Sequence, residues 1–402
     1  MVNNFPPEIG SAAQLFYELG KELSKERYSV TIITATPRPY RLPKIKRKKH
    51  SLKLIEAIYL NGNIKVLKLP PLGYFNVKGL LMLEHQVQPF ILMLGALTQG
   101  KHDVVIAYSP PITIGLVCSI LKILWKAKTI LNVQDPYPET AVKLGLIRNK
   151  IFIKIFEYLS LHIYKTMDFI TVHSHGNKNI ICRYIPGEEN KVVIVYNWVD
   201  TQKLRPLKKL NEYRRKFGDD KFIVLYAGIM SVAQDLVTII EAAKILSQHE
   251  NILFVLAGDG TAKPRIKYLA QSYNLKNVIF LPFQPYDKYP LLIAASDICL
   301  VPLVKTELKS IIPKKLLDIM ACARPVIALG PKNSEVREII LKSECGIYLE
   351  SGKPKALAET ILYLYSKPDI TKKMSINGRT FAVKNFDKRA SITKYIELID
   401  KA

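Results

Sequence analysis

The sequence FIVLYAG at residues 222–228 is followed by a stretch of helical periodicity and then by ILFVLAG at residues 252–258. Both runs are continuously apolar, without the alternation that marks a half-exposed strand. Such runs indicate strands buried on both faces, as in a parallel sheet that is covered by helices. Further runs of this kind, each followed by a helical pattern, are VTIIT (30–34), DVVIAY (103–108), TILNVQ (129–134), DFITVHS (168–174), VVIVYN (192–197), VIFLPF (278–283), DICLVPL (297–303) and PVIAL (325–329). The sequence therefore predicts an α/β protein with doubly wound parallel sheets.

The strand–helix pattern restarts at residue 222, after the polar and basic segment 201–221. Because domain boundaries fall in polar linkers, we expect two α/β domains of similar size, over residues 1–200 and 201–378. The terminal segment 370–402 has no strand pattern and predicts two helices. In sheets of this type ligands bind beyond the carboxyl ends of the strands, so both domains can contribute to one site.

Two segments of the first domain depart from this alternation. IYLNGNIKVLKL (58–69) contains Asn61-Gly62, which is a strong signal for a hairpin turn. The opening MVNNFPPEIGSAAQLFYEL has the form of a strand-to-helix loop at 6–11, but only residues 2–5 are left for the strand before it. We therefore expect a truncated first strand, or a misassigned start codon, where a central strand normally lies.

Composition and charge restrict the class of protein. Of the 402 residues, 49% are hydrophobic and 23% charged, which is typical of a globular protein with a large core. The formal net charge of +25 is spread over both halves and suits anionic partners: nucleotide sugars, phospholipid surfaces or nucleic acid. The densest basic cluster, at 38–49, either binds anionic lipid headgroups or forms a mobile, solvated loop. The sequence does not interleave aromatic and basic residues, so we expect no specific nucleic-acid binding.

The cysteines and the longest apolar stretch bear on location. The five cysteines show neither metal-binding spacing nor a disulfide framework, which fits a reducing cytoplasm. The stretch 111–125 is interrupted by Lys122 and is shorter than the roughly 20 residues that span a bilayer, so it predicts a buried helix. We expect no signal peptide. Peripheral membrane contact is compatible with all of these features.

The segment IIPKKLLDIMACARPV (311–326) predicts a helix with Pro313 at its first position. Lys314 and Lys315 then lie in the first turn, where the positive end of the helix dipole disfavours cations. Two lysines there are explained if an anion, most commonly phosphate, binds among them and the free N–H groups. Asp318 lies on the same face as Lys315 and is placed to bind ribose hydroxyls. A surface helix with ordinary solvated charges is the alternative.

Segments spread over essentially the whole chain resemble, in order and in spacing, the motifs of the GT-B glycosyltransferases of family 4. These segments are FPPEIGSAA (5–13), LNVQDPYPETAVKLGLI (131–147), VYNWVD (195–200), LYAGIMSVAQDL (225–236), LAGDG (256–260), ASDICLVPL (295–303) and PKKLLDIMACARPVIA (313–328). The resemblance implies two Rossmann-like domains that face a cleft. It also implies that the terminal segment 379–402 crosses back toward the first domain.

The resemblance further implies the chemistry. Members of this family move a sugar, with retention of configuration, from a nucleotide sugar such as a UDP-sugar to an acceptor hydroxyl, with no cofactor and no bound divalent metal. The likeness to polysaccharide-type members implies synthesis of a cell-surface polysaccharide or glycolipid on a glycan or lipid-linked acceptor, in the cytoplasm or at the inner face of the membrane. His173 and His175 form a close pair with no cysteine or carboxylate near them, so we expect no metal site.

In the second domain the resemblance places Lys315 on the donor diphosphate and Asp318, where most members have glutamate, on the ribose. Ser310 stands where many members have a further glutamate that contacts the donor sugar. The loop after Gly228 has no arginine, although relatives often supply one there. The other residues predicted at the donor site are Gly228, Gly258, Asp259, Pro313, Lys314 and Glu335. Turn geometry is the alternative explanation for the glycines, and the start of a helix is the alternative for Glu335.

In the first domain the backbone at Gly10 and Ser11 is placed to approach the donor phosphates or the acceptor. Asp135 follows a strand and is a candidate for orienting the acceptor hydroxyl or for stabilising positive charge at the anomeric carbon. Capping of the PYPET turn is its alternative role. Gln134, where other members have histidine, cannot act as a general base, and Glu139 is a further candidate.

Two other functions stay open. A GT-B sugar epimerase would need more acid and base groups than the motifs supply. A degenerate GT-B protein would bind a nucleotide sugar or scaffold a partner enzyme without transfer. Ser310, the arginine-free loop and the missing first strand favour this second possibility.

Overall fold

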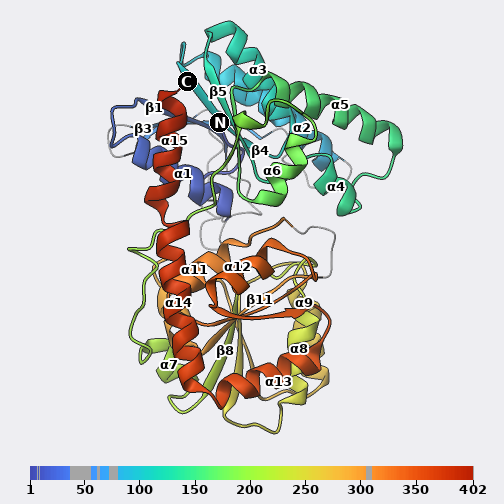
Figure 1. Cartoon of the computed structure of the whole chain (residues 1–402), viewed down its shortest axis with the longest axis vertical. Coiled ribbons are helices and arrows are strands. Elements are labelled where there is room, and N and C mark those ends of the chain that lie inside the picture. The colour runs from blue at the N-terminus through green and yellow to red at the C-terminus, as the bar shows by residue number, and fades with distance from the viewer. Residues whose placement is uncertain are drawn as a thin grey trace. The chain divides into compact units, whose positions relative to one another are not determined.

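The computed structural model describes residues 1–6, 8, 10–36, 56–60, 64–71, 80–304 and 310–401. The chain divides into two compact units (Figure 1). The first unit comprises Met1–Asn197 and Arg389–Ala402, and the second comprises Trp198–Lys388. The limits expected from the sequence were residues 200 and 378.

The second unit contains a six-stranded sheet in which every neighbouring pair is parallel. Its order is β10-β9-β8-β11-β12-β13, so the chain winds outward from β8 in one direction and from β11 in the other. The β8/β11 boundary is therefore the topological switch point, where ligands bind in sheets of this type. The strands are β8 (Phe222–Ala227), β9 (Ile252–Ala257), β10 (Val278–Leu281), β11 (Ile298–Pro302), β12 (Val326–Gly330) and β13 (Gly346–Glu350).

Helices cover this sheet, and β9, β11 and β12 are accordingly buried along their whole length. One group packs α8 against α9 and α13, and another packs α14 against α11 and α12. The helices are α7 (Glu212–Phe217), α8 (Leu236–Ile245), α9 (Lys263–Ser272), α10 (Tyr289–Ala295), α11 (Lys314–Ala321), α12 (Glu335–Ser343), α13 (Pro354–Tyr365) and α14 (Pro368–Phe386). The strand β13 was not predicted, because it is a half-exposed edge strand without a continuous apolar run.

The first unit contains two sheets. Four parallel strands have the order β4-β5-β6-β7, and three others have the order β1-β3-β2, with β1 parallel and β2 antiparallel to β3. The strands are β1 (Val30–Ala35), β2 (Glu56–Leu60), β3 (Ile64–Leu69), β4 (Val104–Ser109), β5 (Lys128–Val133), β6 (Phe169–Val172) and β7 (Val192–Ile194). The antiparallel pairing of β2 with β3 confirms the predicted hairpin. Its turn at Asn61-Gly62 and the basic cluster at 38–49 lie outside the described residues.

The helices of the first unit include one from the far end of the chain. They are α1 (Ser11–Leu23), α2 (Leu80–Leu97), α3 (Thr113–Trp125), α4 (Glu139–Lys143), α5 (Lys150–Thr166), α6 (His175–Cys182), the 3₁₀ turn Glu189–Lys191 and α15 (Lys388–Asp400). On α15, the Tyr395 hydroxyl accepts a hydrogen bond from Asn132 at 2.8 Å and lies 3.1 Å from the Thr171 hydroxyl. The two helices predicted over 370–402 are confirmed as α14 and α15. The buried helix predicted over 111–125 is α3, whose Ile114, Val117 and Leu121 are fully buried.

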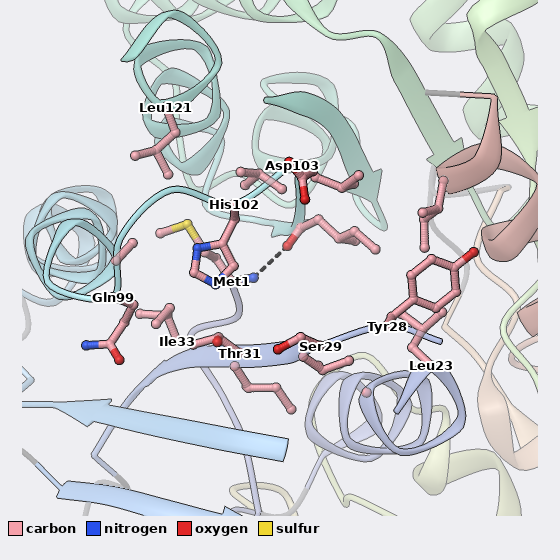
Figure 2. Close-up of a pocket in the computed structure, with 18 of the residues that line it drawn as sticks. Met1, Leu23, Tyr28, Ser29, Thr31, Ile33, Gln99, His102, Asp103 and Leu121 are labelled. Atoms are coloured by element: carbon pink, nitrogen blue, oxygen red, sulfur yellow. Dashed lines mark hydrogen bonds between the residues drawn. The ribbon is translucent and has the colours of Figure 1, made fainter. Parts of the chain in front are cut away.

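Met1 and Val2 lie between the edges of the two sheets of the first unit. The Val2 N–H donates to the Ile33 carbonyl at 3.1 Å, and the Tyr108 N–H donates to the Met1 carbonyl at 3.1 Å. The Met1 amine donates to the Ile106 carbonyl at 2.5 Å, and burial lowers the pKa of this amine to about 6. Beyond the amine a pocket of about 650 Å³ opens beside β1 and β4 (Figure 2).

Candidate active site

Three glycines lock together the loops that follow β8 and β9. Gly228, Gly258 and Gly260 all have positive φ angles, between 146° and 150°, which residues with a Cβ atom rarely adopt. A Cβ on Gly258 would lie 1.9 Å from the Gly228 carbonyl oxygen, and one on Gly260 would lie 2.3 Å from that of Met230. The packing of one loop on the other therefore requires Gly258 and Gly260. This gives both residues a structural role, whether or not a ligand also approaches them.

Gly228 makes room for Lys315. A Cβ on Gly228 would lie 3.0 Å from the Lys315 Nζ, so the lysine side chain of α11 reaches the carboxyl end of β8. Its Nζ donates to the Gln234 Oε1 at 2.8 Å and to the Tyr226 hydroxyl at 3.2 Å, and it lies 4.3 Å from the centre of the Tyr226 ring. Within the described part of the chain no carboxylate pairs with this ammonium. Lys315 is half-buried, and desolvation lowers its pKa to about 7.

Asp318 has a different partner from the one expected. Its Oδ1 lies 2.6 Å from the Nζ of Lys314, one turn earlier on α11, and both side chains are largely buried. The sequence placed Asp318 beside Lys315, three positions earlier. On a helix, however, side chains four positions apart are neighbours just as those three positions apart are, which allows the pair with Lys314. Pro313 is the residue before the helix and not its first residue, so Lys314 begins α11. The helix thus begins one position later than predicted, a difference that is usual for the end of a helix.

The remaining candidates of the second unit surround the carboxyl ends of its strands. Ser310 is half-buried in a turn ahead of α11. Asp259 is exposed after β9 and accepts a hydrogen bond from the Gly260 N–H at 2.9 Å. Glu335 is the half-buried first residue of α12, and Ser334 caps this helix by accepting from the Arg337 N–H.

The half-buried Lys263, at the start of α9, is bound to backbone carbonyls. Its Nζ donates to the carbonyl of Gly258 at 2.7 Å, with that of Leu281 at 3.4 Å. It therefore binds the ends of β9 and β10 together.

In the first unit Asp135 follows β5 at the carboxyl edge of the four-stranded sheet. Desolvation raises the pKa of its carboxyl group. Burial, and after it the charge of Asp135, raises the pKa of the Tyr108 hydroxyl on the neighbouring strand β4. The Tyr108 ring packs edge-on against Phe16 of α1 at 5.4 Å. Asp135 therefore lies near the residues that anchor α1. Gly10 and Ser11, which precede and begin α1, are exposed, and the extended φ of 164° at Gly10 suits any residue.

Gln134 is held by a buried amide network. It exchanges side-chain hydrogen bonds with Asn197 at 2.7 and 3.1 Å and donates to Asn132 at 2.9 Å. Asn177 donates to the Gln134 carbonyl at 2.6 Å and lies 3.2 Å from the His173 Nδ1. Burial lowers the pKa of His173 to about 4, so its imidazole is neutral at physiological pH. Glu139 is the half-buried first residue of α4.

The structure thus brings Gly228, Lys315 and the start of α11 together at the switch point of the second sheet. It also adds two residues that sequence reasoning missed, Tyr226 and Gln234. Relatives often carry an arginine in the loop after Gly228, and its absence here was the one signal for Gln234. A polar side chain in that loop reaches the same edge of the sheet as the arginine would. The pocket of Figure 2 is not part of this site, because it borders the amino-terminal halves of β1 and β4, opposite the carboxyl ends of the strands.

Two family models match consecutive parts of the chain. Glycosyltransferase Family 4 matches residues 12–203, and Glycosyl transferases group 1 matches residues 209–381. The chain belongs to glycosyltransferase family 4. The family and enzyme class predicted from the motifs are therefore confirmed.

Relatives of this glycosyltransferase carry similar names. It is 25% identical over 356 residues to the Escherichia coli protein named "Putative colanic acid biosynthesis glycosyl transferase WcaI", with 84% of each chain covered. It is 22% identical over 283 residues to the uncharacterized glycosyltransferase MJ1069 of Methanocaldococcus jannaschii, with 70% of each chain covered.

Solved structures share the fold of this glycosyltransferase over its whole length. Sucrose-phosphate synthase from Thermosynechococcus elongatus has a TM-score of 0.79 at 15% identity, with 100% of this chain and 98% of the other covered. Anabaena HepE in complex with UDP and glucose has a TM-score of 0.72 at 14% identity, with 100% and 99% covered. Each unit has the Rossmann-like architecture predicted from the sequence, and the fold is that of the GT-B enzymes.

Across residues 80–304, 310–401 and the shorter described segments, no helix has the length and apolarity to cross a membrane. The same residues contain no group of three or more histidine, cysteine, aspartate or glutamate side chains that could hold a metal ion.

Proposed function

We propose that this glycosyltransferase transfers a sugar, with retention of configuration, from a nucleotide sugar to an acceptor hydroxyl during synthesis of a cell-surface polysaccharide or glycolipid. The observation that carries the proposal is the Lys315 ammonium. It lies at the switch point of the second sheet, beside the first turn of α11, and amide and phenol groups hold it in place. The names of WcaI and of the UDP-bound HepE structure support the substrate class.

In this proposal Lys315 stabilises the leaving group. When the bond between the anomeric carbon and the diphosphate breaks, negative charge grows on the departing phosphate. A positioned cation and the free N–H groups of the first turn of α11 oppose that charge, which lowers the barrier. The acceptor oxygen bonds to the anomeric carbon, and its proton passes to the departing phosphate oxygen. This route requires no side-chain base, in keeping with Gln134 and with the neutral, buried His173.

The other candidates would bind and orient the substrates. We assign the ribose to Asp318, with Lys314 as its partner, and further donor contacts to Ser310, Pro313, Asp259 and Glu335. The backbone at Gly228 and Gly258 would border the phosphates. On the first unit Asp135 would orient the acceptor hydroxyl, and Gly10 and Ser11 would offer N–H groups at the start of α1.

The test is a panel of nucleotide sugars, first by thermal shift and then by transfer to glycan and lipid-linked acceptors. Ligands that bind the native state raise its melting temperature. Lys315→Met should lower turnover about 100-fold or more, the usual effect of losing one charge-stabilising donor. Lys276→Met, at an exposed lysine of the same unit, is the matched control and should keep wild-type turnover. Equal turnover by Lys315→Met and wild type would overturn the assignment.

The same panel addresses the non-catalytic alternative that Ser310 favours. Stabilisation by a nucleotide sugar without transfer or donor hydrolysis by the wild type would indicate a binding protein. We also propose that transfer needs no cofactor or divalent metal, so turnover should persist in excess EDTA. Loss of turnover in EDTA with recovery on adding Mg²⁺ or Mn²⁺ would contradict this part.

A further inference from the structure

Helix α5 has apolar residues on two opposite faces. On one face Ile163 and Tyr164 are fully buried, and Ile153, Phe156 and Leu159 pack against the core of the first unit. On the other face Ile151, Ile155 and Tyr158 follow one another at helical spacing, with exposed fractions of 70%, 53% and 73%. A helix at the surface of a globular unit normally carries polar residues on its outer face. The outer stripe of α5 therefore needs a separate explanation.

The stripe continues into the segment that precedes α5. Val142 at the end of α4, Leu144 and Leu146 in the connecting loop, and Phe152 at the start of α5 are also exposed. The two elements pack together, since the Ser160 hydroxyl donates to the Tyr137 carbonyl at 2.6 Å and the Tyr137 and Phe156 rings lie 4.8 Å apart. Figure 1 shows α4 and α5 together at the periphery of the first unit. We call these residues the α4–α5 surface: Val142, Leu144, Leu146, Ile151, Phe152, Ile155 and Tyr158.

Single exposed apolar residues are ordinary, but a cluster rimmed by charge indicates an interaction site. Here the rim is basic, with Lys143, Arg148, Lys150 and Lys154 all exposed. Within residues 142–158 the one acidic residue is Glu157, so the local charge is four minus one, or +3. Within the described residues none of these four cations takes part in an ion pair.

We propose that the α4–α5 surface binds an anionic lipid bilayer, with α5 lying in the plane of the headgroups. Isoleucine, leucine and phenylalanine would enter the boundary between headgroups and acyl chains, and Tyr158 would sit at the headgroup level that aromatic residues favour. The lysines would keep their ammonium groups among the phosphates while their methylene chains follow the apolar surface. The basic rim favours this partner over a second protein, because protein interfaces are depleted in lysine.

This binding would hold the enzyme at the membrane in which a lipid-linked acceptor lies. That last step rests on the proposed function, whereas the binding itself rests on the exposure and charge of the α4–α5 surface.

The experiment is co-sedimentation of the full chain with vesicles of phosphatidylcholine alone or with about one-third phosphatidylglycerol, at low and at physiological salt. The wild type should partition at least about tenfold more strongly onto the anionic vesicles. Ile151→Ser with Ile155→Ser should lower that partition about tenfold or more, because two inserted side chains are lost. The control pair Ile376→Ser with Val383→Ser changes exposed apolar residues of α14 and should have no effect.

Charge is tested in the same way. Lys150→Gln with Lys154→Gln should weaken binding to anionic vesicles about 30-fold at low salt, since each of the two lysines near such a surface contributes about 1 kcal/mol. Lys372→Gln with Lys373→Gln on α14 is the matched control and should bind like the wild type. Far-ultraviolet circular dichroism and melting temperature establish that each variant is folded.

Three results would overturn the inference: no binding of the wild type to either vesicle, equal binding to both, or equal binding of the wild type and the Ile151/Ile155 variant. A wild-type dimer in light scattering that the Ile151/Ile155 variant converts to a monomer would assign the surface to a second copy of the chain instead. The proposed function is tested separately, by measuring sugar transfer to a soluble acceptor. This transfer should be unchanged in all four variants, because it does not depend on binding to a membrane.

Discussion

Lys315 is the residue whose surroundings say most about function. A phenol ring, a phenol hydroxyl and an amide oxygen hold its ammonium, and none of them carries a charge that would neutralise it. Partners of this kind fix the position of the cation but leave its charge available to an anion. Burial, which no counter-charge offsets, lowers its pKa to about 7, so its protonation depends on what binds beside it.

Donor affinity should fall as the pH rises above about 7. In the free protein burial lowers the pKa of Lys315 to about 7, and a bound diphosphate favours the ammonium and raises that pKa again. The diphosphate of a nucleotide sugar keeps its charge in this range, so binding takes up a proton and Kd should rise by up to about tenfold per pH unit. Calorimetry from about pH 6 to about pH 9 measures this, with Lys315→Arg as a permanently charged control. A flat wild-type profile would count against the assignment.

Gln234→Glu places a carboxylate beside Lys315 without changing the size of the side chain. The new charge should raise the pKa of Lys315 and compete with the donor phosphates, so affinity should fall roughly 10- to 100-fold and the pH dependence near 7 should disappear. Titration calorimetry with a nucleotide sugar checks both effects. Gln271→Glu, on the exposed side of α9, supplies the control. Unchanged affinity in Gln234→Glu would mean that Lys315 does not contact the diphosphate.

At the scale of elements, α11 contains a largely buried ion pair of its own, Lys314–Asp318. Asp318→Leu should destabilise the second unit by about 2–4 kcal/mol, because it leaves a poorly solvated ammonium without a partner. Adding Lys314→Met should restore most of that loss, since replacing both partners removes the unpaired charge. Urea unfolding gives these free energies. If Asp318 also binds the ribose, the double variant will regain stability but not donor affinity; full recovery of both would leave Asp318 a structural role alone.

The glycine-locked loops after β8 and β9 make a second prediction at this scale. Gly258→Ala should destabilise the second unit by about 3 kcal/mol or more, because a strained φ and a contact of 1.9 Å with the Gly228 carbonyl act together. Gly352→Ala has a positive φ of 76° but no atom within 4 Å of the added carbon, so it isolates the conformational cost, about 1 kcal/mol. The difference between the two variants in urea unfolding measures the clash, and equal values would show that the loops can separate at no cost.

At the scale of the whole molecule, the carboxyl-terminal residues Arg389–Ala402 belong to the first unit, together with Met1–Asn197. Helix α15 supplies Tyr395, which is almost fully buried and whose hydroxyl binds Asn132 of β5 and Thr171 of β6. Tyr395→Phe should lower the stability of the first unit by about 1–3 kcal/mol, because buried polar groups lose a partner. Hydrogen exchange should show faster opening of β5 and β6 and no change in β8 or β9. Tyr365→Phe, which is 43% exposed on α13, is the control. Faster exchange in both units would contradict this assignment of α15.

Much of the architecture could be predicted because it is encoded locally. The runs at 222–228 and 252–258 are apolar over their whole length since helices cover both faces of those strands, and each run became a strand of the second sheet. The edge strand β13 escaped prediction because one half-exposed strand at a sheet edge has no such pattern. In the site, Gly228, Lys315 and the start of α11 could be predicted because glycine and an N-terminal lysine pair are locally unusual. Tyr226 could not, since a tyrosine in an apolar strand carries no local signal of a partner. For Gln234 the one local signal was indirect, the absence of an arginine from its loop.

By itself the sequence determined the α/β class, the family and the choice of Lys315 as a candidate site residue. The hydrophobic period, the order of the motifs and the residues at a helix start are all evident in short segments of the chain. The tertiary structure alone decided which charges neutralise one another and which side chains stay open. It paired Asp318 with Lys314, placed residues 226 and 234 around an amine at 315, and left the outer face of α5 uncovered. These outcomes depend on the order of strands in a sheet and on the rotation of each helix against it, and both arise from packing between segments far apart in the chain.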